Sequence, residues 1–333
     1  MNSTEIKQLF KSFAEMKVLI IGDVMIDAYF IGKVERISPE APVPVVAVTK
    51  KENRLGGAAN VALNIQSMGA TPILCSVVGD DENAKVLSSL LKKSKMREDG
   101  ILRRKSRTTT VKTRVIGGQH QMLRIDEEMD QDLNPKDTAD FLKNIKSILQ
   151  KERVNAIVFE DYDKGAINQE LIQEVIAIAK AKKIPVAVDP KHRHFNAYKG
   201  VSLFKPNRRE FEHGLKSDFV LDQQHALFLA VSKFQRKQNI ETMLVTLSES
   251  GMLVSHKNKL EKIPAHIRSI ADVSGAGDTV ISVATLCLAG GLSPLNMLRI
   301  ANLAGGLVCE HVGVVPIDKK QLLEETLKIK FTE

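Results

Sequence analysis

The sequence predicts an α/β fold organised around a mostly parallel β-sheet. From residue 134 onward, short apolar runs alternate with longer helical segments, which is the pattern of a parallel sheet built from strand–helix units. Polar residues also follow several of the expected strands, at the sheet edge where open α/β sheets bind ligands. No linker or internal repeat divides the chain, so residues 1–333 are expected to form one domain carrying a small β-sheet lid.

The first part of the chain contains two strands of this sheet and two helices. Residues 17–22 form a short β-branched apolar run, which is typical of a strand buried in a parallel sheet. Gly69 supplies a stop signal for the helix that begins after Gly56 and Gly57. The expected elements are strands at 17–22 and 73–78, and helices from about 55 to 68 and from 82 to 95.

Two segments depart from this pattern and predict the lid. Residues 39–44 contain three prolines, which are confined to edge strands and loops, so residues 29–49 are expected to leave the main sheet and end in a strand at 45–48. Residues 107–126 are rich in strand-forming residues, and Gly117-Gly118 is a hairpin signal. We expect lid segments at about 29–50 and 107–125 to pair with each other and to exclude water from a site.

The second part of the chain alternates regularly between helices and strands. Polar groups follow these strands at Glu160-Asp161-Tyr162, Asp189-Pro190-Lys191 and Lys205-Pro206-Asn207. The expected elements are helices at 135–150 and 168–182, strands at 154–160, 185–189, up to 204 and 242–247, a helix opened by Arg208, a β-meander over 253–270, and small-residue helices from 278 and over 296–310.

The segment 272–279 predicts an anion site at a helix N-terminus. Free backbone N–H groups and the positive end of the helix dipole suit a phosphate there, and Gly275 and Gly277 allow the backbone to approach a ligand closely. Asp278 places a carboxylate at the same point, where it would be repelled by the anion unless it takes a proton from an attacking hydroxyl. The alternative interpretation is that Asp278 only caps the helix.

A second group of polar residues lies near the end of the first strand. Asp23 and Asp27 suit hydrogen bonds with sugar hydroxyls, although a turn-forming Asp23 and a capping Asp27 are equally good interpretations of these residues alone. Gly56 and Gly57 permit close ligand approach at the start of the next helix, and Asn60 adds an amide that can donate and accept.

Composition and motif searches exclude several classes of protein. Neither Gly-x-Gly-x-x-Gly nor Gly-x4-Gly-Lys-Ser/Thr occurs, so both common nucleotide-binding loops are absent from the sequence. No apolar run reaches the 18 or so residues of a membrane span, and three cysteines in apolar contexts indicate a reducing, cytoplasmic location. The net charge of +8 comes without interleaved aromatic residues, so we expect no nucleic-acid partner and no membrane partner.

The motifs together resemble the ribokinase-like (PfkB) carbohydrate kinases. The residues that carry the resemblance cover about 15 to 318, and they are Asp23 and Asp27, Gly56-Gly57-Ala58-Ala59-Asn60, Asn207-x-x-Glu210, Val245-Thr246-Leu247 with Gly251, and Asp272-Val273-Ser274-Gly275-Ala276-Gly277-Asp278. The resemblance implies a three-layer αβα fold, ATP and Mg²⁺ as cofactors, and transfer of a phosphoryl group to a sugar hydroxyl. A monovalent cation is a third candidate cofactor.

A narrower resemblance concerns the substrate. Gly22-Asp23-Val24-Met25, the segment 36–46 and Asp161-Tyr162-Asp163-Lys164-Gly165 are similar to the kinase half of bacterial heptose synthesis enzymes. That family phosphorylates C1 of D-glycero-D-manno-heptose 7-phosphate on the route to ADP-heptose for lipopolysaccharide. In many members of that family a nucleotidyltransferase domain follows; this chain ends at Glu333, so a kinase without that domain is expected. Exposed strands of the lid could pair between two chains, so a homodimer through the lid is also expected.

The resemblance also implies roles for individual residues. Asp278 would be the base, and the N–H groups of Gly275, Ala276 and Gly277 would form the anion hole. The remaining roles concern the two substrates: Asp23, Asp27, Gly56, Gly57 and Asn60 for the sugar, Asn207, Glu210, Thr246, Ser248 and Gly251 for the nucleotide, and Asn207 with Glu210 for Mg²⁺ through water. Arg36 and Lys191 are added as candidate cations for the phosphate that the substrate already carries. Ser248 stands where glycine is frequent in the family, and Ser274 stands where threonine is frequent.

Three alternative functions are compatible with these residues. The protein could phosphorylate another sugar or sugar phosphate, such as fructose phosphate or ribose. It could be a catalytically silent sugar-binding regulator, although binding alone does not require a base at Asp278. Nucleic-acid binding has only the net charge in its favour. Candidate cations for a substrate phosphate are Arg36, Lys191 and the lid residues Lys112, Arg114 and Arg124.

Overall fold

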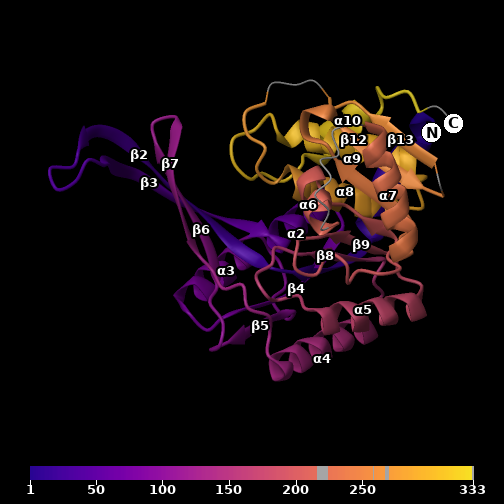
Figure 1. The fold of residues 1–333 in the computed structure, drawn as a ribbon, viewed down its shortest axis with the longest axis horizontal. Coiled ribbons are helices and arrows are strands. Elements are labelled where there is room, and N and C mark those ends of the chain that lie inside the picture. The colour runs from indigo at the N-terminus through magenta and orange to yellow at the C-terminus, as the bar shows by residue number, and fades with distance from the viewer. Residues whose placement is uncertain (216–223, 258, 267–269, 332–333) are drawn as a thin grey trace.

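A central sheet of nine strands is seen in the computed structural model, which describes residues 1–215, 224–257, 259–266 and 270–331. Its strands are β1 (Lys17–Gly22), β4 (Thr71–Gly79), β5 (Ile101–Arg104), β8 (Ala156–Glu160), β9 (Val186–Asp189), β10 (Leu203–Phe204), β11 (Thr242–Thr246), β12 (Met252–His256) and β13 (Lys259–Ile263). The order is β13-β12-β11-β10-β9-β8-β1-β4-β5, and only the pairs β11–β12 and β12–β13 are antiparallel (Figure 1). The predicted mostly parallel sheet is confirmed.

Helices cover both faces of this sheet and complete the three layers. They are α1 (Ser3–Ser12), α2 (Ala58–Ser67), α3 (Glu82–Lys93), α4 (Pro135–Lys151), α5 (Gln169–Lys182), α6 (Arg208–Gly214), α7 (Gln224–Gln238), α8 (Ala276–Ala289), α9 (Pro294–Val308) and α10 (Lys319–Thr326). Successive side chains of β1 point to opposite faces of the sheet, so this strand contributes to two separate apolar cores. Val18 and Ile20 join the core of α1–α3 and α8–α10, and Leu19 and Ile21 join the core of α4–α7.

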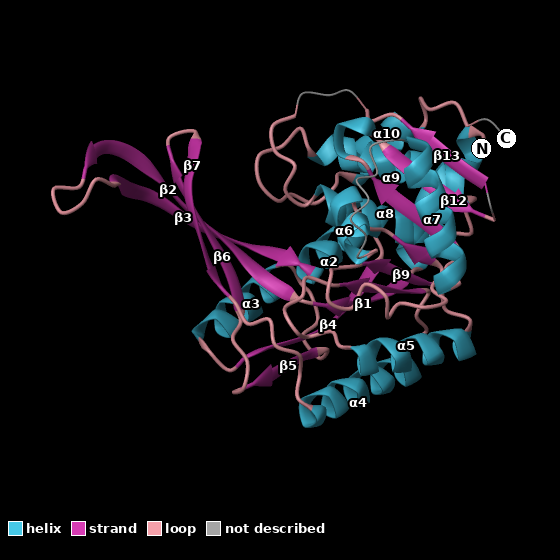
Figure 2. Cartoon of the chain, viewed as in Figure 1, coloured by secondary structure: helices cyan, strands magenta, loops and turns pink. Residues whose placement is uncertain are grey.

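Four further strands form a small sheet that extends away from the layers. They are β2 (Val24–Ile37), β3 (Pro44–Gly57), β6 (Thr110–Gly117) and β7 (His120–Glu127), in the order β3-β2-β6-β7 (Figure 2). Strands β2 and β3 are longer than the sequence suggested, because the first two prolines of the 39–44 run lie in the turn and Pro44 begins β3. The two lid segments were expected to pair with each other, and they do so through the parallel pairing of β2 with β6.

Several elements differ from the sequence-based expectation. Helices α1, α7 and α10 and the short strand β5 were not predicted. The expected meander at 253–270 contains the two strands β12 and β13, while residues 258 and 267–269 lie outside the described part of the chain. Helix α8 begins two residues before Asp278, and α9 begins at Pro294 instead of 296. Among the described helices, none has both the length and the apolar composition that crossing a bilayer requires.

Candidate active site

Asp278 is buried in the first turn of α8 and hydrogen-bonded on both carboxylate oxygens. Asn60 Nδ2 donates to Asp278 Oδ2 at 2.7 Å, and the Tyr162 hydroxyl donates to Asp278 Oδ1 at 2.8 Å. The N-cap of α8 is Gly275, and no side chain caps this helix, so the interpretation of Asp278 as a capping residue is wrong. Burial raises the pKa of Asp278, which makes its carboxylate a better proton acceptor than an exposed aspartate.

The loop before α8 leaves backbone amides open beside this carboxylate. Gly275 has a φ of +79°, and a Cβ at this position would lie 2.9 Å from Asn60 Nδ2, so only glycine suits the turn. The Ala276 amide already donates to the Val273 carbonyl at 3.3 Å. No acceptor is found within the described residues for the amides of Gly275 and Gly277. Two of the three predicted anion-hole amides are therefore open.

A buried lysine faces the same loop from the end of β10. A Cβ added to Gly277 would lie 3.6 Å from Lys205 Nζ and 3.9 Å from Asp189 Oδ2. Lys205 is only 3% exposed and pairs with Asp189 at 2.7 Å. Burial lowers the pKa of Lys205, but the charges of Asp189 and Glu210 outweigh this effect and raise it, so the ammonium stays charged. An anion at the loop would thus meet both open amides and a fixed cation.

Asp27 is the carboxylate that the small sheet contributes to the site. It lies in β2, is buried, and pairs with Arg114 of β6, which also stacks on the ring of Tyr29. A Cβ at Gly56 would lie 2.1 Å from Asp27 Oδ2, so the glycine makes room for this carboxylate. The charge of Asp27 also reaches Asp278, where it contributes to the raised pKa.

Asp23 organises a loop instead of pointing its oxygens into an open space. Its Oδ2 accepts from the amides of Tyr162 at 2.9 Å and Lys164 at 3.1 Å, and its Oδ1 accepts from the amide of Ala166 at 3.0 Å. The sequence suggested contacts with sugar hydroxyls, but these three amides take up much of the carboxylate's capacity as an acceptor. Gly57 makes room for the backbone of Asp23, because a Cβ at Gly57 would lie 2.4 Å from the Asp23 carbonyl oxygen.

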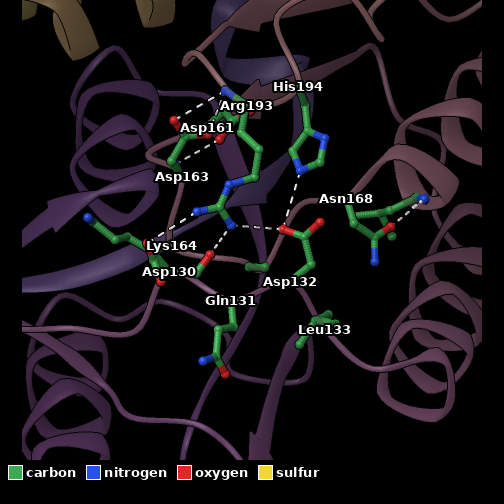
Figure 3. A network of polar contacts seen from close by, with 12 residues as sticks. Asp130, Gln131, Asp132, Leu133, Asp161, Asp163, Lys164, Asn168, Arg193 and His194 are labelled. Atoms are coloured by element: carbon green, nitrogen blue, oxygen red, sulfur yellow. Dashed lines mark hydrogen bonds and ion pairs between the residues drawn. The ribbon is translucent and has the colours of Figure 1, made fainter.

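The same loop is tied down from its other side by a polar network (Figure 3). Asp161 Oδ1 accepts from the amide of Asp163 at 2.9 Å, and Asp163 Oδ2 accepts from the amide of His192 at 3.1 Å. The Arg193 side chain then reaches Asp132 at 3.2 Å, and His194 reaches the same carboxylate oxygen at 3.3 Å. The loop after β8 is therefore held between Asp23 and this network, and it places the Tyr162 hydroxyl on Asp278.

Asn207 and Glu210 form the N-terminal cap of α6. The Asn207 side chain accepts from the Glu210 amide at 2.9 Å, and Glu210 Oε2 accepts from the Asn207 amide at 2.8 Å, which is a capping box. Glu210 Oε1 pairs with Lys191, whose ammonium also lies over the ring of Tyr162. The predicted metal residues and the predicted phosphate ligand Lys191 are thus in contact with one another at the site.

A cavity of about 340 Å³ lies between β11, β12 and α9, and it leads away from the loop before α8 that carries the open amides. The predicted nucleotide residues Thr246, Ser248 and Gly251 line it, and Ala276 and Gly277 lie at its border with the loop. Its size is within the range of small-molecule sites. Ser248 has a φ of +52°, which explains why glycine is frequent at this position in the family that the chain resembles.

A larger cavity of about 870 Å³ lies away from these residues. It is lined by Lys180, Lys183, Lys199 and other residues of α5 and of the loop after β9, and it contains none of the predicted catalytic, nucleotide or sugar residues. We assign the reaction site to the smaller cavity. The open amides of Gly275 and Gly277 and the buried carboxylate of Asp278 border this cavity or lie next to it.

Several predicted cations do not reach the group around Asp278. Arg36 is exposed on β2, nine residues beyond Asp27, which corresponds to about 30 Å of extended strand at about 3.3 Å per residue. Lys112 pairs with Asp126 and Glu128, and Arg124 pairs with Asp126. Of the five candidate cations for a substrate phosphate, Arg114 and Lys191 are the two whose partners belong to the site.

Four residues of the site were not assigned roles from the sequence. Tyr162 and Glu160 follow or end β8, Asp189 ends β9, and Lys205 follows β10. The available signal was their position, because each lies at the carboxyl end of a parallel strand, where ligand sites form. Their roles depend on which side chains turn toward α8, and that information is not contained in the strand pattern.

The chain is similar in sequence to known carbohydrate kinases and to larger bifunctional proteins. The pfkB family of carbohydrate kinases matches residues 15–320. The Bifunctional protein HldE of Geobacter sulfurreducens is 36% identical over 324 residues, which are 97% of this chain and 65% of that protein. The protein of the same name from Helicobacter pylori strain G27 is 39% identical over 299 residues, covering 89% of this chain and 63% of that protein. The chain thus spans about two thirds of the length of these curated relatives.

Solved structures share the fold at low sequence identity. Phosphofructokinase-2 from Escherichia coli, in complex with fructose-6-phosphate, superposes with a TM-score of 0.75 at 19% identity, covering 93% of this chain and 99% of that one. Ribokinase from Arabidopsis thaliana, complexed with ribose and ATP, has a TM-score of 0.72 at 17% identity, covering 95% and 99%. The three-layer architecture with a small accessory sheet is therefore shared with these structures.

Proposed function

The chain belongs to the pfkB family of carbohydrate kinases, and from this premise we propose that it phosphorylates the C1 hydroxyl of D-glycero-D-manno-heptose 7-phosphate with ATP. The product would be the 1,7-bisphosphate, an intermediate on the route to ADP-heptose. The observation that carries the proposal is the buried carboxylate of Asp278 next to the open amides of Gly275 and Gly277. This arrangement provides a proton acceptor and an anion site at the same point, which is what phosphoryl transfer to an alcohol requires.

The proposed mechanism is in-line transfer of the γ-phosphoryl group. Asp278 takes the proton of the attacking hydroxyl, while Asn60 and the Tyr162 hydroxyl hold its carboxylate in one orientation. The amides of Gly275 and Gly277 donate to the oxygens of the transferring group, where negative charge develops. Lys205 Nζ lies 3.6 Å from the Cβ position at Gly277 and adds a fixed positive charge. Most of the rate enhancement comes from positioning and charge stabilisation.

The cavity beside β11 is the proposed site of the nucleotide. Thr246, Ser248 and Gly251 would contact it, and the phosphates would extend toward Gly277. Mg²⁺ supplied with ATP neutralises charge on the phosphates, and Asn207 and Glu210 are proposed to hold it through water, since their own oxygens are engaged in the α6 cap and with Lys191. Asp27, Gly56 and Asn60 would contact the sugar, with Arg114 and Lys191 nearest to a substrate phosphate.

The choice of heptose phosphate rests on sequence similarity. The segments 22–25, 36–46 and 161–165 are similar to the heptose kinases, and the relatives named HldE match almost the entire chain. In the structure, residues 161–165 form the loop that places Tyr162 on Asp278. One of the segments that are similar to the heptose kinases therefore contacts the proposed base directly.

The substrate assignment is tested by measuring ADP release with a panel of sugars. We expect heptose 7-phosphate to give the highest kcat/KM, ahead of fructose 6-phosphate and ribose. Replacing K⁺ with Na⁺ in the same assay measures any monovalent-cation requirement. Higher kcat/KM with ribose or fructose 6-phosphate would redirect the assignment to another sugar, and no ADP release with any sugar would leave a silent binding protein.

We further propose that the protein is a homodimer formed through the small sheet. Seven of the eleven exposed large apolar side chains among the described residues lie on this sheet, and such side chains mark interaction surfaces when they are grouped. They lie on β2, β3, β7 and the β2–β3 turn, and they are Val34, Ile37, Val43, Val48, Met122, Leu123 and Ile125. Arg36 lies on the same extension, so a dimer would bring it to the partner chain instead of to its own Asp278.

The dimer is tested by replacing two of these residues with charged ones. Leu123→Glu with Ile125→Glu is expected to convert the wild-type dimer to a monomer in sedimentation velocity at micromolar concentration, because two carboxylates cannot be buried in an apolar interface. Leu229→Glu is the matched control, since this leucine is 60% exposed on α7, outside the small sheet. A monomeric wild type, or a dimer that survives the double change, would contradict the proposal.

A further inference from the structure

The larger cavity, of about 870 Å³, has a basic wall that the proposed reaction does not use. It lies between the C-terminal half of α5, the segment 192–202, the end of α6 and residues 239–241. Three lysines line it, Lys180, Lys183 and Lys199, whereas Glu241 is the single acid among the described residues that do so. The wall therefore carries an excess of positive charge, which attracts anions.

The three lysines are available to an external anion. Each of them is exposed, and none has an ion-pair partner among the residues that the structure describes. A basic side chain in the last turn of a helix offsets the helix dipole, which accounts for Lys180. Lys199 comes from the loop before β10, so the dipole of α5 does not account for the whole cluster.

The arginine of the wall is already engaged. Arg193 pairs with Asp132 at 3.2 Å and with Asp130 at 3.3 Å, and His194 lies 3.3 Å from the same oxygen of Asp132 (Figure 3). These two acids do not line the cavity. They hold Arg193 in the network that supports the loop after β8, so the uncompensated charge of the wall belongs to the three lysines.

Neutral groups complete a site of small-molecule size. The imidazole rings of His192 and His213 are in edge contact, with 4.8 Å between their centroids, and each ring carries an N–H donor. Asn239 adds a side-chain amide, and Ile184 and Pro185 add apolar surface. A cavity of this volume is within the range of small-molecule sites and is larger than a single phosphate group requires.

We propose that this cavity binds a small anion that carries at least two phosphate groups. Lysine binds phosphate as a compact point charge, without the fixed geometry that an arginine pair with a carboxylate needs. Three unpaired lysines on two segments of the chain provide charge for more than one phosphate group. The site goes beyond the proposed function, because none of the residues assigned to the reaction lines this cavity.

The test is the rate of lysine acetylation in the whole chain, followed residue by residue by mass spectrometry. The probes are inorganic pyrophosphate, ADP and fructose 1,6-bisphosphate, and the probe that protects at the lowest concentration identifies the source of the phosphate groups. With a probe at about 10 times its Kd, about a tenth of the molecules are free, so acetylation of Lys183 and Lys199 is expected to slow about 10-fold. Because the readout is specific to each lysine, a probe bound near Asp278 does not obscure it.

Lys183→Gly combined with Lys199→Ala removes two of the three cations. Lys183 has a φ of +56°, which glycine adopts without strain, so the variant is expected to fold and to melt near the wild-type temperature. The probe concentration that half-protects Lys180 is expected to rise at least about 10-fold. If the double variant does not fold, Lys199→Ala alone takes its place, with the loss of protection measured at Lys180 and Lys183.

Lys95 supplies the matched control. It is exposed, follows α3 with a φ of +55° and does not line the cavity. Its amide donates to the carbonyl three residues earlier, as the amide of Lys183 does at the end of α5. In wild type, the acetylation rate of Lys95 is expected not to change with the probe. Lys95→Gly makes the same backbone change at another helix end, and its half-protection of Lys180 is expected to match wild type.

The proposal is overturned if none of the three probes protects Lys183 and Lys199 at concentrations up to about 10 mM. It is equally overturned if Lys95 is protected to the same degree, since the anion would then bind exposed lysines in general, or if the double variant protects Lys180 as wild type does. Each of these results leaves the kinase assignment intact, because the measurement needs no sugar and no turnover. Conversely, a protein whose cavity lysines are protected but which releases no ADP with any sugar would overturn the proposed function and not this site.

Discussion

Asp278→Asn is expected to lower kcat at least about 100-fold, which is the lower range of the loss for removal of a general base. The amide cannot accept the proton of the sugar hydroxyl, although it has nearly the same size as the carboxylate. Asn60 can still donate to the remaining oxygen, and the Tyr162 hydroxyl can accept from the new amide group, so both contacts can persist. The change therefore tests the chemistry of this side chain separately from its packing.

The melting temperature of Asp278→Asn is expected to equal or exceed that of wild type. Burial raises the pKa of Asp278, which means that folding disfavours its charged form, and a neutral amide avoids this cost. Steady-state kinetics and thermal unfolding on the same preparation separate the two effects. A variant with a lowered Tm and an unchanged kcat would show that Asp278 stabilises the fold without acting as a base.

Asp318→Asn is the matched control for this experiment. Asp318 caps α10 by accepting from the Gln321 amide at 2.7 Å, and asparagine caps helices about as well as aspartate. We expect both kcat and Tm of Asp318→Asn to match wild type. A similar loss of kcat in both variants would indicate a general effect of changing an acid in this protein, and the assignment of Asp278 as the base would fail.

Asp23→Asn is expected to lower the free energy of unfolding by about 2 kcal/mol or more. In wild type, the two oxygens of Asp23 accept from three loop amides, those of Tyr162, Lys164 and Ala166. Asparagine offers one oxygen and one NH₂ group, so at least one buried donor loses its acceptor and faces another donor. Leaving a buried donor unsatisfied costs about 1–3 kcal/mol, and a hydrogen bond to a charged group contributes about 1.5–3 kcal/mol.

The loss is measured as the change in the free energy of unfolding in urea. We also expect kcat to fall, because the same loop places the Tyr162 hydroxyl on Asp278. Asp80→Asn, at an exposed position after β4, is the control and is expected to keep both stability and kcat. If Asp23→Asn keeps its stability but raises KM for the sugar about 10-fold or more, Asp23 contacts the sugar directly, as the sequence suggested.

Sequence patterns predicted the architecture well where local physical chemistry determines it. The apolar run at 17–22 and the regular alternation after residue 134 correspond to β1 and to the strand–helix units from α4 onward. The small sheet was predicted, but its length was not. Strands β2 and β3 are stabilised by pairing with each other across two register shifts, and the local sequence pattern does not contain this pairing. Helices α1 and α10 were missed because they are short amphipathic segments near the termini, whose apolar faces are buried only by the assembled core.

The sequence by itself determined the fold class, the family and the approximate position of the site, because strand-end polar residues and glycine turns are local features. It also identified Asp278 and the loop at Gly275 and Gly277. Only the tertiary structure decided that Asp23 supports a loop and that Arg36 lies far along the small sheet. It alone brought Glu160, Asp189 and Asp278 together, because contacts between the ends of different strands and a helix depend on how the layers pack.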